Sequence, residues 1–287
     1  MQVVRDSEAE KFLSEAKSLL YADEATNSLL LGLAEMVRNK GESGQTEAVL
    51  LRVVHEGQTL TAALQTPPMN LVISESENRP LKVLAQYLKS NQLKFPGVVG
   101  PANSSEMFAK MWSRECGCHF ELGMGQMIYK INEVEIPQQA VEGSLRLAQL
   151  NEISLIASWL VEFGNESLPP NERKSFEERL PYAERAIQNQ NAYLWEVGGV
   201  AVSMAHVGRP TKNGISISAV YTPPINRKKG YASALVAHLS QRMLDSGKQF
   251  CVLYTDLANP TSNKIYQKIG YRAIAESKLF IFQGGHL

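Results

Sequence analysis

The sequence predicts a mixed α/β fold organised as two domains, and three observations support this prediction. The chain has 287 residues, which exceeds the usual size of a single hydrophobic core. Its 44% hydrophobic and 20% charged residues allow sizeable cores and are not typical of disordered or fibrous proteins. In both halves, segments with strand patterns alternate with segments of helical periodicity. This order favours a sheet flanked by helices over a sandwich or a helical bundle.

The first half begins with two helical patterns, residues 7–20 and 25–38, in which apolar residues recur at three- and four-residue spacing. Apolar and β-branched residues between turn signals then predict strands, including a hairpin that turns at residues 55–58. A helix with proline in its first turn follows. The remaining elements predicted for this half are strands at 47–57, 58–66, 69–75, 95–100 and 119–131 and helices at 80–90 and 104–116.

The best candidate for a linker is residues 132–143, which are polar, contain a central proline and have no clear periodicity. We therefore expect one domain at 1–135 and a second at 143–287.

The second half predicts a similar order of elements. Gly198 and Gly199 suit the positive φ angles of a tight hairpin, and Pro181 is expected to interrupt or kink a charged helix. The predicted elements are strands at 144–149, 192–197, 200–208, 214–222, 250–257 and 271–282 and helices at 152–165, 172–190, 231–247 and 260–270. Each half ends as strand, short helix, strand. Together with PANSS at 101–105 and LANPTS at 257–262, this suggests a duplication, although the register between the halves drifts.

Charge and cysteine content narrow the expected partners and compartment. The chain has 29 basic and 29 acidic residues, so no overall field attracts it to nucleic acid or to an anionic membrane, and we expect neither partner. Three cysteines do not resemble a disulfide framework and fit a reducing compartment. The sequence has no signal-peptide pattern and no run of 18 uncharged apolar residues. We expect a cytoplasmic protein, as a monomer or a homodimer.

The turn PPINRKKG, between the strand at 214–222 and the helix at 231–247, is a candidate anion site. The first N–H groups of a helix have no partner within it, and the helix dipole favours a phosphate there. Gly230 allows the backbone to approach an anion, and Ala232 keeps the next turn slim. Arg227, Lys228 and Lys229 add positive charge. The alternative is an ordinary solvent-exposed basic turn.

Neither of two common nucleotide-binding motifs accompanies this turn. The sequence contains no G-x-x-x-x-G-K-[ST], and no G-x-G-x-x-G follows a predicted strand. ATP hydrolysis and a dinucleotide cofactor are therefore disfavoured.

A second polar pair lies thirty residues further on. Asn259 followed by Pro260 is typical of a helix start, and Tyr266 lies seven residues after Asn259, nearly two helical turns. The amide and the phenol would then project from the same side of the helix. Tyr266 is equally compatible with a core residue whose hydroxyl reaches the surface.

Together, two motifs resemble the GNAT acetyltransferase superfamily over about residues 144–287. They are R-x-x-G-x-A (Arg227, Gly230, Ala232) and N-x-x-S-x-x-x-Y-x-K-x-G-Y (Asn259, Ser262, Tyr266, Lys268, Gly270, Tyr271). The resemblance implies two tandem GNAT-like domains, each a mixed sheet flanked by helices. The first would be degenerate, because Arg79 has no glycine three residues later with which to accept a pyrophosphate.

The resemblance also implies an acetyl-CoA site between two splayed parallel strands. Tyr266 resembles the general acid that protonates the departing thiolate, and an amine would attack the thioester directly. Asn259, with Ser262 nearby, resembles the residue that holds the pantetheine amide. The other implied coenzyme-binding residues are Val220, Tyr221 and Thr222 for the pantetheine arm, and Arg227, Lys228, Lys229, Gly230, Tyr231 and Ala232 for the pyrophosphate.

The general base is less clearly indicated. Glu196, at the end of a strand, is our candidate, and Glu166 at the end of a helix is another. For each, a solvated surface carboxylate is the alternative, and water chains can also remove a proton.

Two other groups of residues suggest sites and have simpler interpretations. Cys116, Cys118 and His119 resemble part of a zinc site, but the second ligand pair is missing, so we expect no metal. Trp159, Phe163 and Trp195 form an acceptor pocket or, as the spacing favours, pack in the core.

The sequence leaves several functions open. The leading one is N-acetyl transfer to a small-molecule or peptide amine. The alternative is a non-catalytic acyl-CoA-binding module, which the coenzyme stabilises by mass action. A GNAT-related aminoacyl transferase that uses charged tRNA is disfavoured by the zero net charge.

Overall fold

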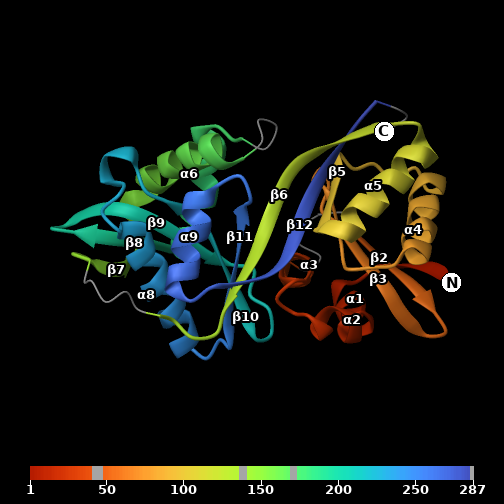
Figure 1. Cartoon of the computed structure of the whole chain (residues 1–287), viewed down its shortest axis with the longest axis horizontal. Coiled ribbons are helices and arrows are strands. Elements are labelled where there is room, and N and C mark those ends of the chain that lie inside the picture. The colour runs from red at the N-terminus through yellow and green to blue at the C-terminus, as the bar shows by residue number, and fades with distance from the viewer. Residues whose placement is uncertain (41–47, 136–140, 169–172, 285–287) are drawn as a thin grey trace. The chain divides into compact units, whose positions relative to one another are not determined.

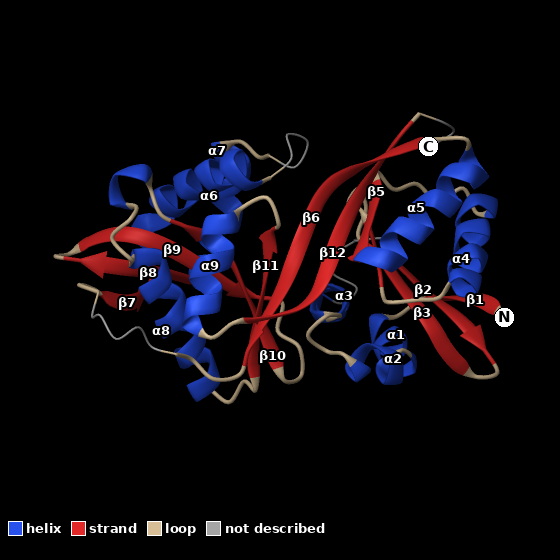
Figure 2. Ribbon diagram, in the orientation of Figure 1, coloured by secondary structure: helices blue, strands red, loops and turns tan. Residues whose placement is uncertain are grey.

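The computed structural model describes residues 1–40, 48–135, 141–168 and 173–284 (Figure 1). The chain divides into two compact units. Unit 1 comprises Met1–Ile128, Arg209–Lys212 and the residues from Ile274 onward, and unit 2 comprises Tyr129–Gly208 and Asn213–Ala273. Each unit combines helices with a mixed sheet (Figure 2). The predicted fold class, a mixed sheet flanked by helices, is therefore confirmed.

Unit 1 contains a sheet in the order β1-β2-β3-β4-β5-β12-β6. Strands β1 to β4 pair antiparallel to one another in sequence order, and β4 pairs parallel to β5. Its strands are β1 (Gln2–Asp6), β2 (Val49–His55), β3 (Gln58–Gln65), β4 (Leu71–Ile73), β5 (Gly97–Pro101), β6 (His119–Ile131) and β12 (Arg272–Gln283). Its helices are α1 (Ala9–Glu15), α2 (Lys17–Ala22), α3 (Ser28–Lys40), α4 (Asn78–Ser90) and α5 (Ala102–Cys116).

Side chains that alternate along the strands build a core on each face of this sheet. Leu50 and Leu64 pack with residues of α1 and α3, whereas the adjacent Leu51 and Ala63 pack with α4 and α5. Because successive side chains of a strand point to opposite faces, both faces are buried and each is covered by helices.

Unit 2 contains the strand order β11-β10-β9-β8-β7. Strands β7 to β10 are again antiparallel neighbours, and β10 is parallel to β11. The strands are β7 (Ser144–Leu147), β8 (Ala192–Val197), β9 (Val200–Gly208), β10 (Gly214–Tyr221) and β11 (Phe250–Asp256). The helices are α6 (Ile153–Ser167), α7 (Phe176–Gln188), α8 (Tyr231–Asp245) and α9 (Pro260–Ile269).

Helices α6 and α8 cover opposite faces of the unit 2 sheet. Leu194 packs in one core with α6 and α7. Its neighbours in β8 face α8: the Tyr193 ring contacts Arg242 at 5.6 Å, and the Trp195 ring lies 5.2 Å from that of His238. Helix α9 packs against α8. The two faces of β10 therefore contact different helices, α6 on one face and α8 on the other.

The two halves of the chain repeat one order of elements. In each, a first strand is followed by helices, three more strands, a helix, a strand, a helix and a final strand. The parallel pair β4 and β5 of unit 1 corresponds in this order to β10 and β11 of unit 2. The similar outline predicted from the two halves of the sequence is therefore present in the structure.

Strand β12 belongs largely to unit 1, although it follows unit 2 in the sequence. Ser277 to Ile281 pair antiparallel with β5. Phe280 and Phe282 lie in the core that α4 and α5 cover. Unit 1 is thus completed by the last strand of the chain.

Most predicted elements lie where the sequence places them, and Pro181 is an exception in one respect. The sequence predicts that Pro181 interrupts or kinks its helix; α7 continues through Pro181, so the interruption does not occur. A capping box formed by Ser175 and Glu178 holds the first turn, and a proline near this end removes only one intrahelical hydrogen bond.

The predicted linker lies partly outside the described residues. Among the helices that the structure describes, none has the length and apolar character needed to cross a bilayer.

Candidate active site

The parallel strands β10 and β11 separate part of the way along their length. Their pairing runs from Gly214 with Phe250 to Ser216 with Val252, although β10 continues to Tyr221. Between Ser218 and Tyr221, the register of β10 with β9 also shifts, and Ala219 adopts a φ of +49°. A bulge of this kind bends the strand and ends regular pairing. The result is the splayed parallel pair that the GNAT resemblance implies.

The turn after β10 has the backbone geometry of an anion-binding nest. A short 3₁₀ helix, Pro224–Asn226, leads into the turn, and Gly230 is the N-cap of α8. Lys228 has a φ of +63° and Gly230 a φ of +83°. Left-handed residues in such turns direct successive N–H groups toward one point, where the helix dipole also favours negative charge.

The N–H groups of this turn are available to a ligand. The first intrahelical bond of α8 runs from the N–H of Ala234 to the carbonyl of Gly230 at 3.0 Å. Within the described parts of the chain, no protein group accepts a hydrogen bond from the backbone N–H groups of residues 228–233. A loop with several converging, unpaired N–H groups at a helix start matches the needs of a pyrophosphate.

The three cations of the turn have different surroundings. Both oxygens of the Glu166 carboxylate accept hydrogen bonds from Nη2 of Arg227, at 2.7 and 2.8 Å. Arg227 also donates through Nε to the Thr222 carbonyl at 2.8 Å. Lys228 and Lys229 are exposed, and Nζ of Lys229 lies 6.0 Å from the ring centre of Tyr231. Arg227 therefore braces the turn, whereas the two lysines leave their charge at its rim.

The end of β10 is held by side chains from two neighbouring elements. The Ser203 hydroxyl, on β9, donates to the Tyr221 carbonyl at 2.9 Å and lies 2.8 Å from the Thr222 hydroxyl. The Tyr221 hydroxyl donates to Oε2 of Glu162, on α6, at 2.6 Å. Burial and the nearby Glu162 carboxylate raise the pKa of Tyr221. The backbone of Val220 lies within the bulge, between the paired ends of the strand.

At the start of α9, an asparagine that the sequence motif does not single out links strand and helix. Asn263 donates to the carbonyls of Asp256 and Asn259, at 3.3 and 2.9 Å, and accepts from the Thr255 hydroxyl at 3.1 Å. Asn259, the predicted pantetheine ligand, is exposed. The Ser262 side chain lies outside the described residues. The sequence gives no local signal for Asn263, because its partners Thr255 and Asp256 lie at the end of β11 and are brought to it only by the fold.

Tyr266 is buried, at 8% exposure, on the face of α9 that the structure packs with aromatic residues. Its ring lies 6.4 Å from that of Tyr129 and 5.9 Å from that of Tyr271. Burial raises the pKa of Tyr266 to about 12, so its phenol keeps its proton at neutral pH. A protonated phenol is the form that a general acid requires.

Glu196 lies on β8, two strands away from β10, and is ion-paired. Its Oε2 accepts from Nε of Arg146 at 2.5 Å, and the same guanidinium also binds Glu152 at 2.7 Å. The Glu196 carboxylate is therefore already engaged by a protein cation. The assignment of Glu196 as base stays a prediction.

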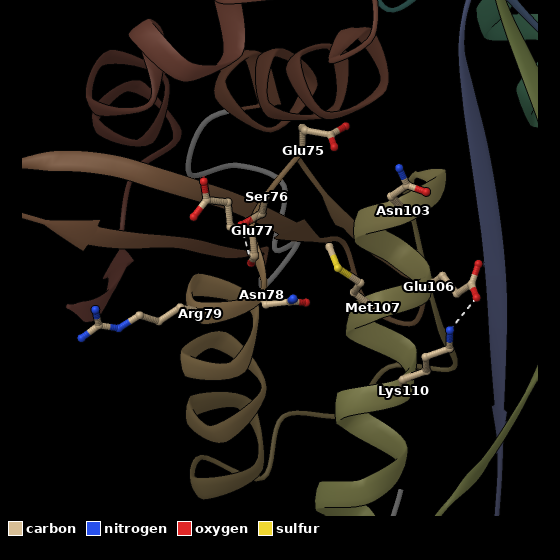
Figure 3. Close-up of a pocket in the computed structure, with 9 residues that line it drawn as sticks. All are labelled: Glu75, Ser76, Glu77, Asn78, Arg79, Asn103, Glu106, Met107 and Lys110. Carbon is tan, nitrogen blue, oxygen red and sulfur yellow. Dashed lines mark hydrogen bonds and ion pairs between the residues drawn. The ribbon is translucent and has the colours of Figure 1, made fainter.

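The corresponding turn of unit 1, between β4 and α4, has a different chemistry (Figure 3). Glu77 is the N-cap of α4, and Arg79 lies within the helix and points away from α5. A hollow of ≈ 710 Å³ lies beside this turn and α5. Its charged lining is Glu75, Glu77, Arg79, Glu106 and Lys110, in which carboxylates outnumber cations. Because Glu106 and Lys110 pair with each other at 2.7 Å, the hollow offers little to a diphosphate.

The other residues highlighted by the sequence differ in burial: Phe163 and Cys116 are half-buried, Cys118 is buried and His119 is exposed. Trp159 and Trp195 are buried, and the indole of Trp195 donates to the Glu142 carbonyl at 2.9 Å. This placement favours core packing over an acceptor pocket. Cys116 and Cys118 are free, and burial raises the pKa of both thiols. No group of potential metal ligands occurs among the residues that the structure describes.

The splayed strands, the glycine turn and the following helix together define a GNAT-type fold. A family model described as FR47-like protein matches residues 201–281, from β9 to β12. The GNAT resemblance drawn from the motifs is therefore confirmed. No curated protein sequence matches the chain significantly.

Solved structures extend the similarity to both units. A Drosophila protein is 11% identical, with 98% of each chain covered and a TM-score of 0.71. A tandem GNAT protein from the clavulanic acid biosynthesis pathway is 11% identical, with 100% of this chain and 98% of that chain covered and a TM-score of 0.61. A GCN5-related N-acetyltransferase from Sphaerobacter thermophilus is 16% identical, with 97% of this chain and 94% of that chain covered and a TM-score of 0.60. At these identities the similarity establishes the fold, that of tandem GNAT proteins.

Proposed function

We propose that this protein is an acyltransferase that moves the acetyl group of acetyl-CoA to a primary amine by direct attack. The observation that carries the proposal is the turn at residues 228–233, whose N–H groups have no acceptor in the described chain and follow a strand that has separated from its parallel neighbour. This arrangement suits a diphosphate joined to an extended thioester arm.

Each part of the coenzyme has candidate ligands in unit 2. The N–H groups of the turn and the exposed Lys228 and Lys229 would hold the pyrophosphate. The backbone of β10 near Val220 and Tyr221, beyond the point where β10 and β11 stop pairing, would bind the pantetheine amides together with Asn259. Arg227 would act indirectly, because its guanidinium is already bound by Glu166. Holding the thioester beside an amine supplies proximity and orientation.

Tyr266 would protonate the thiolate as the carbon–sulfur bond breaks. The buried phenol remains protonated through the physiological pH range because its pKa is raised to about 12. In this proposal, the acceptor is a small-molecule or peptide amine, and the protein acts as a monomer or homodimer in the cytoplasm. Unit 1 would be a degenerate copy without a coenzyme turn, which its carboxylate-rich hollow supports.

A thermal-shift titration with acetyl-CoA and longer acyl-CoAs tests the binding step. We expect acetyl-CoA to raise the melting temperature by mass action. A panel of amines with detection of free thiol then tests transfer. If no acyl-CoA stabilises the protein, the proposal is wrong.

A non-catalytic acyl-CoA-binding module is the alternative, and Tyr266→Phe separates the two. The variant should keep the acetyl-CoA shift of the wild type, because the phenylalanine ring fills the same space. If Tyr266 is the general acid, turnover should fall about 10²–10⁴-fold. Equal and negligible turnover of both proteins with every amine, despite coenzyme binding, would favour the binding module.

A further inference from the structure

An exposed carboxylate on α6 lies directly beside the end of β10. Oε2 of Glu162 accepts a hydrogen bond from the Tyr221 hydroxyl at 2.6 Å. Tyr221 is only 4% exposed, whereas Glu162 is exposed to solvent. The carboxylate is therefore fixed on one side by a buried phenol and open to solvent on the other.

Glu162 differs from neighbouring carboxylates of unit 2 in having no cation to balance it. Glu166, one turn further along α6, is paired with Arg227, and Glu196 is paired with Arg146. Within the described residues, no lysine, arginine or histidine forms an ion pair with Glu162. Arg227 lies 5.7 Å from the Tyr221 ring, but its guanidinium is bound by Glu166, so the negative charge of Glu162 is left for a cationic ligand.

The position of Glu162 suits the acceptor rather than the coenzyme. Tyr221 is the last residue of β10 and lies beyond the point where β10 and β11 stop pairing. Tyr221 and α6 share the core on one face of the sheet, whereas α8 packs on the other. A coenzyme bound at the start of α8 and a group bound by Glu162 would approach the separated strands from opposite faces.

We propose that Glu162, oriented by Tyr221, binds the ammonium group of the acceptor amine. This inference rests on the proposed acetyl transfer. Primary amines are protonated at neutral pH, and a carboxylate held in one orientation forms a charge-assisted hydrogen bond with an ammonium. The Tyr221 oxygen, which donates its proton to Glu162, has lone pairs left to accept a second N–H.

The proton balance of the reaction agrees with an exposed carboxylate at this position. The bound ammonium loses one proton through Glu162 to solvent, and the free amine then forms the new carbon–nitrogen bond. As the carbon–sulfur bond breaks, nitrogen loses a second proton and the thiolate gains one. An ammonium and a thioester thus give an amide, a thiol and one released proton.

Glu162→Gln tests this role, with Glu184→Gln as the matched control. The glutamine oxygen can still accept the Tyr221 hydrogen bond, so the substitution removes the charge and keeps the local contact. Glu184 is an exposed residue of α7 whose substitution removes the same charge. Phenethylamine, spermidine and a tripeptide with a free N-terminus serve as probes, and the best acceptor of the wild type is used for all variants.

We expect Glu162→Gln to raise KM for the amine at least about 10-fold, as expected for loss of one charge-assisted contact. The melting-temperature shift with acetyl-CoA should equal that of the wild type. Salt should raise the KM of the wild type and of Glu184→Gln but have little effect on that of Glu162→Gln.

Three results overturn the inference. One is an amine KM for Glu162→Gln within twofold of the wild type, and another is an equal rise for Glu184→Gln. Either leaves acetyl transfer itself intact. If the wild type shows neither a shift with acetyl-CoA nor free thiol with any probe, the proposed function fails, and the inference fails with it.

Discussion

Gly230 has two reasons to be glycine at the residue scale. Its φ of +83° lies in the left-handed region, and an added Cβ would lie 3.1 Å from the Val141 side chain. The same residue starts α8 and shapes the turn with the unpaired N–H groups. A side chain at this position should therefore disturb both local stability and the approach of an anion.

Gly230→Ala should lower the free energy of unfolding by about 1 kcal/mol and strongly reduce the thermal shift with acetyl-CoA. Gly57→Ala is the matched control. Gly57 has a φ of +77°, and an added Cβ there has no neighbour within 4 Å. It should carry a similar backbone penalty and keep the full coenzyme shift. Equal coenzyme shifts for both variants would contradict the assigned turn.

His206 makes stability sensitive to acid. The residue is 1% exposed, and neither ring nitrogen has a hydrogen-bond partner in the described chain. Its ring stacks on Tyr182 at 5.7 Å. Burial, with a smaller contribution from Arg179, lowers the pKa of His206 to about 4. The folded state therefore binds a proton less readily than the unfolded chain.

Because the pKa of His206 is lower in the folded state than in the unfolded state, acid favours unfolding. The contribution of this residue to the free energy of unfolding is fully present above the unfolded pKa of about 6.5 and is lost as the pH falls toward 4. The free energy of unfolding should fall by about 3 kcal/mol over this range from this residue alone. Urea unfolding of the wild type and of His206→Leu, at several pH values, measures the difference. A pH slope that is the same in both proteins would exclude this role for His206.

At the scale of elements, strand β1 is held by a buried ion pair. Arg52 on β2 donates to both oxygens of Asp6, at 2.6 and 3.0 Å. Both residues are 4% exposed. Asp6→Ala would leave the Arg52 charge buried without this partner, which typically costs about 3–5 kcal/mol.

Urea denaturation of Asp6→Ala measures this loss. Glu10→Ala is the control, because its pair with Arg38 is exposed and such pairs contribute about 0–1 kcal/mol. A loss for Asp6→Ala no larger than that for Glu10→Ala would show that the buried pair does not stabilise β1.

The same strand shows where prediction from sequence ends. The helical and strand periodicities and the glycine turns predicted nearly every later element, because those signals are local. Strand β1 was missed because its five residues include Arg5 and Asp6, and its burial depends on an arginine 46 residues away. The residues of the candidate site likewise fall into those that the local sequence predicts and those that it does not. The glycine turn has a local signature, whereas Glu162 and Asn263 gain their roles only from tertiary contacts.

At the scale of the molecule, the last strand of the chain, β12, joins the sheet of unit 1 and pairs with β5, which lies far earlier in the sequence. Phe280 is 5% exposed and packs in the first unit's core with Leu51 and Leu84. The sequence predicted this strand but not the sheet that it joins, because strand partners depend on topology rather than on local pattern.

Phe280→Ala should therefore destabilise unit 1, by about 3–5 kcal/mol. Hydrogen exchange should accelerate in β2 and β3 and change little in β8 and β9. Ile274→Ala is the control, because Ile274 is 40% exposed, and it should change neither the stability nor the hydrogen exchange of these strands. Faster exchange confined to β8 and β9 would contradict the assignment of β12 to unit 1.

This strand order has a consequence during protein synthesis. The ribosome releases β1 to β5 long before β12, which is made only after the whole of unit 2. Until then, the edge of β5 that pairs with β12 has no neighbour, and Phe95 and Trp112 lack their ring contacts with Phe282. A nascent chain must therefore shield that edge, by a chaperone or by transient pairing, and translation that stops after unit 2 would leave an aggregation-prone product.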